Sequence, residues 1–207
     1  RSKPGIWENT PVLDIASMHP TSIIELNLFG EYTENYKALK DVRVMIKHKD
    51  FDAIGKMWNG ALVKYLGDNK TLKKLSTALK IPINSAYGLT SAKFDNPLRD
   101  PRNKNNIVAL RGALFMKTLM DEVEARGFEV AHIKTDSIKI PNCTKELMDF
   151  VMEFGKKYGY TFEYESLYEK MCLVNDAVYI AKYADDDVNG EHRGEWTATG
   201  TQFQVPY

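Results

Sequence analysis

The chain has 207 residues, 43% of them hydrophobic, and its 28 basic and 28 acidic side chains leave no net charge. This composition is typical of a globular protein with a buried core, and no apolar run is long enough to span a membrane. No signal peptide opens the chain and its two distant cysteines predict neither a zinc site nor a disulfide framework, so we expect a cytoplasmic protein without a membrane partner.

The first elements in chain order are a strand and a set of helices. The stretch "TPVLDIAS" predicts a strand that ends near Asp14, and Pro20 in "HPTSIIELN" is suited to open a short helix. Helical periodicity then covers residues 34–49, 51–66 and 70–80, with breaks at Asp50 and at "GDN", residues 67–69.

The second half alternates between loops, helices and short strands. Residues 95–106 are rich in turn formers and predict a loop. The pattern then predicts a helix at 107–126, a hairpin at 128–140, a helix at 144–158 and strands at 160–166 and 170–183. This order indicates an α+β fold in which helices back an antiparallel sheet and a helical lobe is inserted.

The positive charge is concentrated in the helical region. From Lys37 to Lys80 there are eleven basic residues against four acidic ones, so the rest of the chain is acidic. A cationic insert of this kind can attract a polyanion at one place, although solvated helix faces give the same pattern.

Two acids stand at predicted strand ends. Asp14 closes "PVLD", and Asp136 lies at the tip of the hairpin "HIKTDSIKI", residues 132–140. Aspartate is a good turn residue, so an ordinary turn is the plainer interpretation. If the fold brings the two together, however, paired carboxylates suit the two magnesium ions of phosphoryl transfer.

A third motif carries a cation, an amide and an aromatic ring at helical spacing. In "KIPINSAYG", residues 80–88, the side chains of Lys80, Asn84 and Tyr87 fall on one helix face. Together with the two acids, this stretch resembles the family B DNA polymerases in their bacteriophage branch. "DIASMHPTSII" is similar to the family's DxxSLYPSII, "KIPINSAYG" to KxxxNSxYG and "KTDS" to DTDS, and "FEYESLYEKMCLVNDAVY" resembles the stretch leading into KKRY.

The resemblance covers residues 11–183 in the family's motif order. It implies a ferredoxin-like or RRM-like palm with an inserted helical fingers lobe. Palm would occupy residues 1–30 and 89–207, and fingers residues 31–88.

The resemblance also implies roles for individual residues. Asp14 and Asp136 match the metal-binding aspartates, and backbone from Ile15 to Met18 would contact metal and triphosphate. The residues that match the nucleotide site are Ser17, Met18, His19, Arg43, Lys47, Lys80, Asn84 and Tyr87. Accessory candidates are Thr135, Glu163, Glu165 and Lys182. For Arg43 with Lys47 the alternative is a solvated helix face, and for Glu163 with Glu165 it is an exposed strand edge.

Four positions depart from the family pattern. Lys134 replaces the first Asp of DTDS, and His19 replaces the tyrosine that acts as the sugar gate. Pro82 lies within the second motif, where it removes a helical hydrogen bond. "DAVY", residues 176–179, replaces KKRY and lacks its three cations, which leaves Lys182 as a candidate for gripping the primer.

The resemblance implies a DNA-directed DNA polymerase that uses two Mg²⁺ ions, with Mn²⁺ as an alternative, and acts on dNTP and primer-template DNA. An exonuclease and a thumb would come from the same polypeptide or from separate subunits, in the cytoplasm of a host cell if a phage encodes the chain. The rival interpretation is an inactive polymerase-like module that binds nucleic acid or scaffolds a replication complex. A third, an unrelated structural domain, would require all four motif matches to be accidents.

Overall fold

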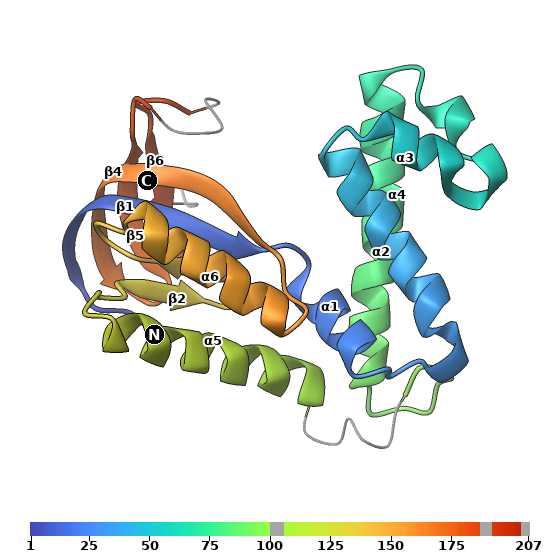
Figure 1. The fold of residues 1–207 in the computed structure, drawn as a ribbon, viewed down its shortest axis with the longest axis horizontal. Coiled ribbons are helices and arrows are strands. Elements are labelled where there is room, and N and C mark those ends of the chain that lie inside the picture. Colours follow the sequence, from blue (N-terminus) through green and yellow to red (C-terminus); the bar gives the residue numbers. More distant parts are fainter. Residues whose placement is uncertain (100–105, 187–191, 204–207) are drawn as a thin grey trace. The chain divides into compact units, whose positions relative to one another are not determined.

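The computed structural model describes residues 1–99, 106–186 and 192–203 (Figure 1). It divides into two compact units: the sheet unit, Arg1–Ala16 with Gly112–Tyr207, and the helical unit, Ser17–Arg111. In the sequence, the helical unit thus lies between the two parts of the sheet unit. Its boundaries lie outside the predicted range 31–88, because α1 packs against α2 and α4.

The sheet unit contains one antiparallel sheet. Its strands are β1 (Gly5–Ile15), β2 (His132–Lys134), β3 (Ser137–Lys139), β4 (Phe162–Asn175), β5 (Val178–Tyr183) and β6 (Trp196–Thr199). Their spatial order is β2-β3-β1-β4-β5-β6, so β1 lies between β3 and β4. This arrangement confirms the mixed helix and antiparallel sheet class.

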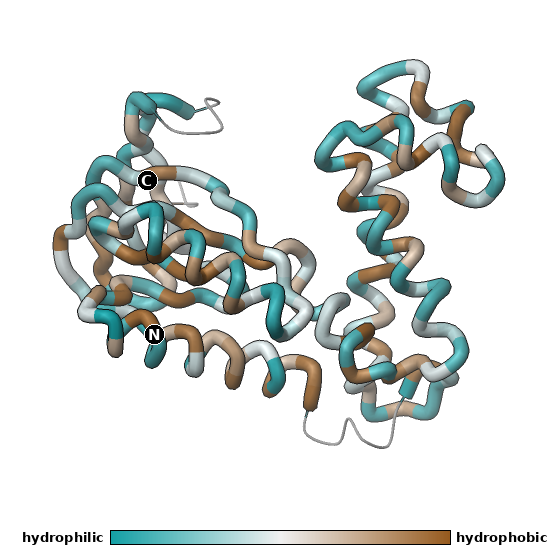
Figure 2. The backbone as a smooth tube through the Cα atoms, viewed as in Figure 1, coloured by the Kyte–Doolittle hydropathy of each residue, from teal (hydrophilic) through white to brown (hydrophobic). Residues whose placement is uncertain are grey.

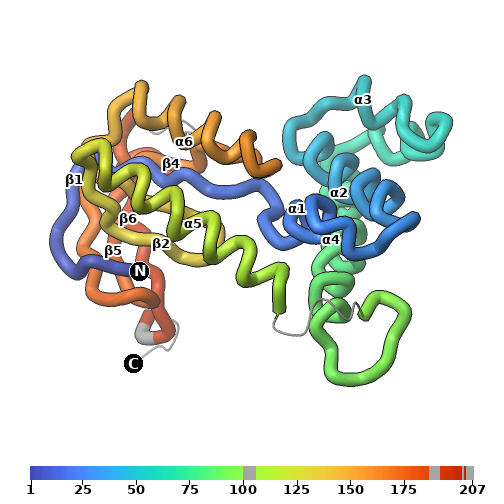
Figure 3. Tube along the Cα trace, turned by 60° about the horizontal axis from the view of Figure 1, so that its bottom comes forward, coloured from blue at the N-terminus to red at the C-terminus, as the bar shows by residue number. Residues whose placement is uncertain are grey.

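Two helices back the sheet. They are α5 (Ile107–Ala125) and α6 (Lys145–Lys157), and α6 begins after Thr144, whose hydroxyl accepts a hydrogen bond from the Leu147 N–H. From Gly112 onward α5 lies beside α6 (Figures 1 and 3), with the Phe115 and Phe154 rings 5.7 Å apart. The close approach of the Phe162 ring to Gly155 leaves no room for a β-carbon there.

The two sides of the sheet have different surroundings. Ile15 pairs with Phe162, whose ring contacts Phe115 of α5, so these residues lie on the helix side. Partners across an antiparallel ladder point to the same side and neighbours in a strand to opposite sides. Asp14 therefore lies on the other side, which we call the aspartate face.

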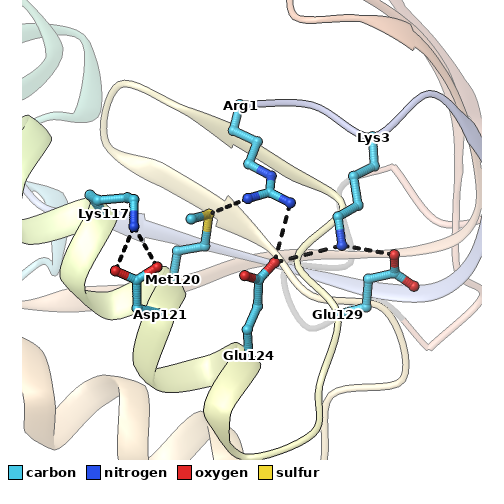
Figure 4. A network of polar contacts seen from close by, with 7 residues as sticks. All are labelled: Arg1, Lys3, Lys117, Met120, Asp121, Glu124 and Glu129. Carbon is cyan, nitrogen blue, oxygen red and sulfur yellow. Dashed lines mark hydrogen bonds and ion pairs between the residues drawn. The ribbon is translucent and has the colours of Figure 1, made fainter.

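Residues 1–3 are fixed against α5 by ionic contacts (Figure 4). The Lys3 ammonium lies 2.9 Å from a Glu129 carboxylate oxygen and 3.6 Å from a Glu124 oxygen, and the Arg1 guanidinium lies 3.5 Å from the same Glu124 oxygen. A separate pair, Lys117 with Asp121, joins successive turns of α5.

The helical unit is built on its own core. Its helices are α1 (Met18–Glu25), η1 (Gly30–Tyr32), α2 (Thr33–Lys47), α3 (Phe51–Lys56), η2 (Met57–Gly60), η3 (Val63–Tyr65) and α4 (Asn69–Thr90). Buried side chains of α2 and α4, among them Val42, Ile46 and Ile83, meet in one cluster. Figure 2 shows hydrophobic and hydrophilic residues alternating along these helices, as expected when one side is buried.

The predicted helix at 51–66 is wrong. Trp58, Asn59 and Gly60 have φ angles of 48°, 55° and 81°, and three residues in the left-handed region end a helix. The structure therefore breaks this stretch into α3 and two short 3₁₀ helices. The helix predicted at 70–80 continues to Thr90 through Pro82.

The strands at the carboxyl end also differ from the prediction. Strand β4 runs without interruption through residues 167–169, where a break between two strands was predicted. The turn comes instead at Asp176 and Ala177, where the Asn175 side chain accepts a hydrogen bond from the Ala177 N–H. Strand β6 was not predicted. Residues 100–105 of the predicted loop lie outside the described residues.

Within the described part of the chain, no helix combines the length and apolar character needed to cross a membrane. Cys143 and Cys172 are both free thiols.

Candidate functional site

The fold places the two predicted aspartates side by side in the sheet unit, one on β1 and one in the turn between β2 and β3. Asp14 on β1 is the register partner of Ser137 on β3, directly after Asp136. The Ile15 N–H donates a hydrogen bond of 2.9 Å to the Asp136 carbonyl oxygen, so the two backbones are in direct contact. Thr135, with φ 53°, makes the tight turn that leads from β2 to Asp136. Metal binding by this pair stays a prediction.

A third acid faces Asp14 from its other neighbour. Glu163 on β4 is the register partner of Asp14. Asp14 therefore lies between Glu163 on β4 and, on β3, Ser137, the residue that follows Asp136. Glu165 lies where the register between β1 and β4 shifts, opposite Val12 and Leu13. Both glutamates were accessory candidates, and the structure places Glu163 closest in register to the aspartates.

These carboxylates have the chemistry of a magnesium site. Mg²⁺ prefers oxygen ligands and is commonly held by one or two carboxylates together with substrate phosphates. Asp14, Asp136 and the Ile15 carbonyl fit that pattern. Among the described residues there is no group of three or more His, Cys, Asp or Glu side chains arranged to hold a metal on its own. Lys134, which takes the place of a further carboxylate, is exposed.

A buried lysine at the edge of this site was not predicted. Lys139 on β3 is only 3% exposed, and its ammonium lies 3.4 Å from the Ser137 hydroxyl and 5.4 Å from the centre of the Tyr179 ring. Burial lowers its pKa, whereas Tyr179, Glu165 and Asp14 act in the opposite direction. The sequence gives no sign of this burial, because it comes from the fold, in which Tyr179 of β5 packs over the ammonium.

His132 is the neighbour of Lys139 across the hairpin. It is fully buried, and burial together with the Lys139 charge lowers its pKa to about 4, so the ring is neutral at pH 7. Its Nε2 lies 3.2 Å from the Asp176 carbonyl oxygen, which fixes the proton on that nitrogen.

In the helical unit, Arg43 of α2 contacts the start of α1. An Arg43 guanidinium nitrogen donates to the Ser17 hydroxyl at 3.4 Å, and the buried Nε has no hydrogen-bond partner among the described residues. Ser17 itself has φ 60° and does not cap α1 with its side chain. The N–H groups at this helix start and the unfilled Arg43 donor suit an anion.

His19 and Tyr87 form a stacked pair. Their ring centres are 4.3 Å apart and their planes differ by 12°. The Asn106 side-chain amide donates to the Tyr87 hydroxyl at 3.1 Å. The two residues that the family resemblance assigns to different parts of a nucleotide, one to the sugar and one to the base, therefore contact each other in the structure.

Three of the remaining predicted site residues lie on helix surfaces, and the fourth, Lys182, lies on strand β5. Lys47, Lys80 and Asn84 are exposed, and Lys80 and Asn84 share a face of α4 one turn apart. Lys182 is already paired with Glu169 at 2.6 Å, which raises the pKa of its ammonium. An ammonium held in this way is a weaker candidate for gripping the primer than the sequence suggested.

Comparison with known proteins gives a consistent result, although no protein-family profile matches the chain. DNA polymerase 1 of Sulfurisphaera ohwakuensis is 26% identical over 213 residues, which cover 90% of this chain and 24% of that protein. DNA polymerase 2 of Aeropyrum pernix is 24% identical over 234 residues, covering 99% of this chain and 29% of that protein. The chain resembles DNA polymerases along nearly its whole length.

The fold is similar to that of a solved DNA polymerase structure. The family B DNA polymerase of the hyperthermophilic archaeon Pyrobaculum calidifontis superposes with a TM-score of 0.63 over 96% of this chain and 28% of that one, at 16% identity. At this identity the likeness concerns the fold alone. The chain spans less than a third of the length of these relatives, so the activity of the whole protein is a separate question.

Proposed function

We propose that the chain is the palm and fingers of a bacteriophage-type family B DNA polymerase and takes part in templated nucleotidyl transfer from dNTP to a primer 3′-hydroxyl. The observation that carries the proposal is the juxtaposition of Asp14 and Asp136 on β1 and at the tip of β2–β3. Similarity to polymerases over nearly the whole chain supports it.

The sheet topology supports the assignment of the sheet unit as palm. Elements β1, α5, β2, β3, α6 and β4 follow one another as β-α-β-β-α-β, with strand order β2-β3-β1-β4. This is the connectivity of a ferredoxin-like layer. The inserted helical unit then corresponds to the fingers.

In the proposed reaction the primer 3′-oxygen attacks the α-phosphorus of dNTP, the bond to the pyrophosphate oxygen breaks and the hydroxyl proton leaves to solvent. Two Mg²⁺ ions, or Mn²⁺, would supply charge stabilisation at the attacking and leaving oxygens. Asp14, Asp136 and the Ile15 carbonyl would hold them. These groups need not form a covalent intermediate, because positioning and charge carry most of phosphoryl transfer.

The helical unit would bind the nucleotide. Arg43, Lys47 and Lys80 pair with the triphosphate, and the N–H groups at Ser17 and Met18 add donors at the start of α1. Asn84 contributes a further polar contact from the same face as Lys80. His19 and Tyr87, whose rings stack on each other, would lie under the sugar and beside the new base pair, as the family resemblance implies.

The rival proposal, an inactive module that binds nucleic acid, is favoured by Lys134 and by the missing KKRY cations. A primer-extension assay with dNTP and Mg²⁺ separates the two. We expect extension when the exonuclease and thumb regions are supplied in cis or as subunits, and weak primer-template binding without them, because phosphate contacts supply most non-specific affinity. No extension in either case, with DNA still bound, would favour the rival.

His19 should set the choice of sugar. An imidazole is smaller than the phenol that the family carries here, so we expect His19→Tyr to strengthen discrimination against ribonucleotides about tenfold, which is the range that one steric contact gives. The measurement is the ratio of kcat/KM for dNTP and rNTP. Equal ratios in the two proteins would remove His19 from the sugar site, and His48→Tyr on the exposed end of α2 is the control.

A further inference from the structure

Lys139 lies on the aspartate face of the sheet, together with Asp14. It is the register partner of Val12 on β1, and Asp14 follows two positions later on the same side of that strand. Its neighbours on β3 and β2, Ser137 and His132, share this side. The ammonium therefore shares a face of the sheet with the carboxylate of Asp14.

Charged and polar groups face Lys139 from every strand around it. Glu165 and Asp14 attract its charge from β4 and β1, and Lys134 repels it from the end of β2. The Tyr179 ring on β5 lies 5.4 Å from the ammonium, and the same ring lies 5.9 Å from His132. The ammonium is thus held over an aromatic face, and the ring and the two acids oppose the lowering of its pKa by burial.

A lysine in such a place is costly for folding alone. A lysine side chain normally extends to keep its ammonium in water, and burying the charge requires compensation from nearby acids and hydrogen bonds. A methionine of similar length would fill the same space without that cost. The Ser137 hydroxyl, the Tyr179 ring and the two acids offset part of this cost, and the charge acts in turn on those acids.

The local charge balance indicates what that effect is. Asp14 on β1, Asp136 in the β2–β3 turn and Glu163 and Glu165 on β4 would carry four negative charges, and Lys134 with Lys139 reduces the formal charge to −2. Such a charge matches one divalent cation.

We propose that Lys139 is a positioning residue that serves as an internal counter-cation for Asp14 and Glu165 and lowers the affinity of the carboxylates for divalent cations. This inference rests on the proposed function, because it takes the carboxylates to be metal ligands. Lys139 keeps the acids from repelling one another in the metal-free protein, and Tyr179 keeps the ammonium in place.

Mn²⁺ binding, followed by the electron paramagnetic resonance signal of the free ion, tests the proposal without DNA or dNTP. Lys139→Met and Lys139→Gln should each bind Mn²⁺ about tenfold more tightly than the wild type at constant ionic strength, because a repelling charge near the ion is removed. Lys139→Arg keeps the charge and should stay within about twofold.

The matched control is Lys170→Met, which removes the same charge from a position on β4 whose side chain is 53% exposed and lies beside Glu8. It should leave the affinity unchanged. Lys139→Gln keeps a hydrogen-bonding group and serves if the methionine variant does not fold, as judged by circular dichroism. Unchanged or weaker binding by a folded Lys139→Met or Lys139→Gln variant would overturn the proposal, since a purely structural lysine predicts that result. If no variant binds Mn²⁺, the metal site of the proposed function is itself wrong.

Discussion

Asp136→Asn is expected to abolish primer extension while the protein stays folded. The substitution removes a charge from the pair of carboxylates and keeps the shape of the side chain. Metal ions in such sites stabilise the transition state by several kcal/mol, so the rate should fall at least about 10³-fold. The hydrogen bond between the Ile15 N–H and the Asp136 carbonyl oxygen involves backbone only and should persist.

The measurement is single-turnover extension of a labelled primer by the chain with its flanking regions, at saturating dNTP and Mg²⁺. Asp149→Asn makes the same chemical change on the exposed side of α6 and is the control. Thermal unfolding within a few degrees of the wild type would show that the fold is kept. Extension at the wild-type rate would remove Asp136 from the site and leave the inactive-module proposal in place.

Local sequence patterns predicted most of the fold. The strand at Asp14, the helices at α2, α5 and α6 and the hairpin around Asp136 all follow from hydrophobic periodicity and turn residues. Errors arose where backbone dihedral angles, rather than hydropathy, determine where a helix ends. Trp58 and Asn59 adopt left-handed angles that a helical pattern does not reveal, although the pair Asn59-Gly60 is a turn signal.

In the candidate site, too, some residues could be predicted from the sequence and others could not. Asp14 and Asp136 were found because each stands at a strand end, and the register of β1 with β3 brings them together. Lys139 could not be found, because its burial depends on Tyr179, forty residues further along the chain. The pairing of Lys182 with Glu169 depends likewise on the register of β4 with β5, which spacing in the sequence does not give.

Lys80→Ala is expected to raise the KM for dNTP at least about tenfold, with little change in primer-template affinity. The ammonium is exposed on α4, one turn before Asn84, and a charge-assisted contact to a phosphate is worth about 1.5–3 kcal/mol. The measurement is extension rate against dNTP concentration, with DNA affinity obtained separately by fluorescence anisotropy. Lys73→Ala, two turns earlier on the same exposed helix, removes an equal charge and is the control. A uniform loss of DNA affinity in both variants, with the KM unchanged, would show that the helix binds nucleic acid by charge alone and that Lys80 does not contact the nucleotide.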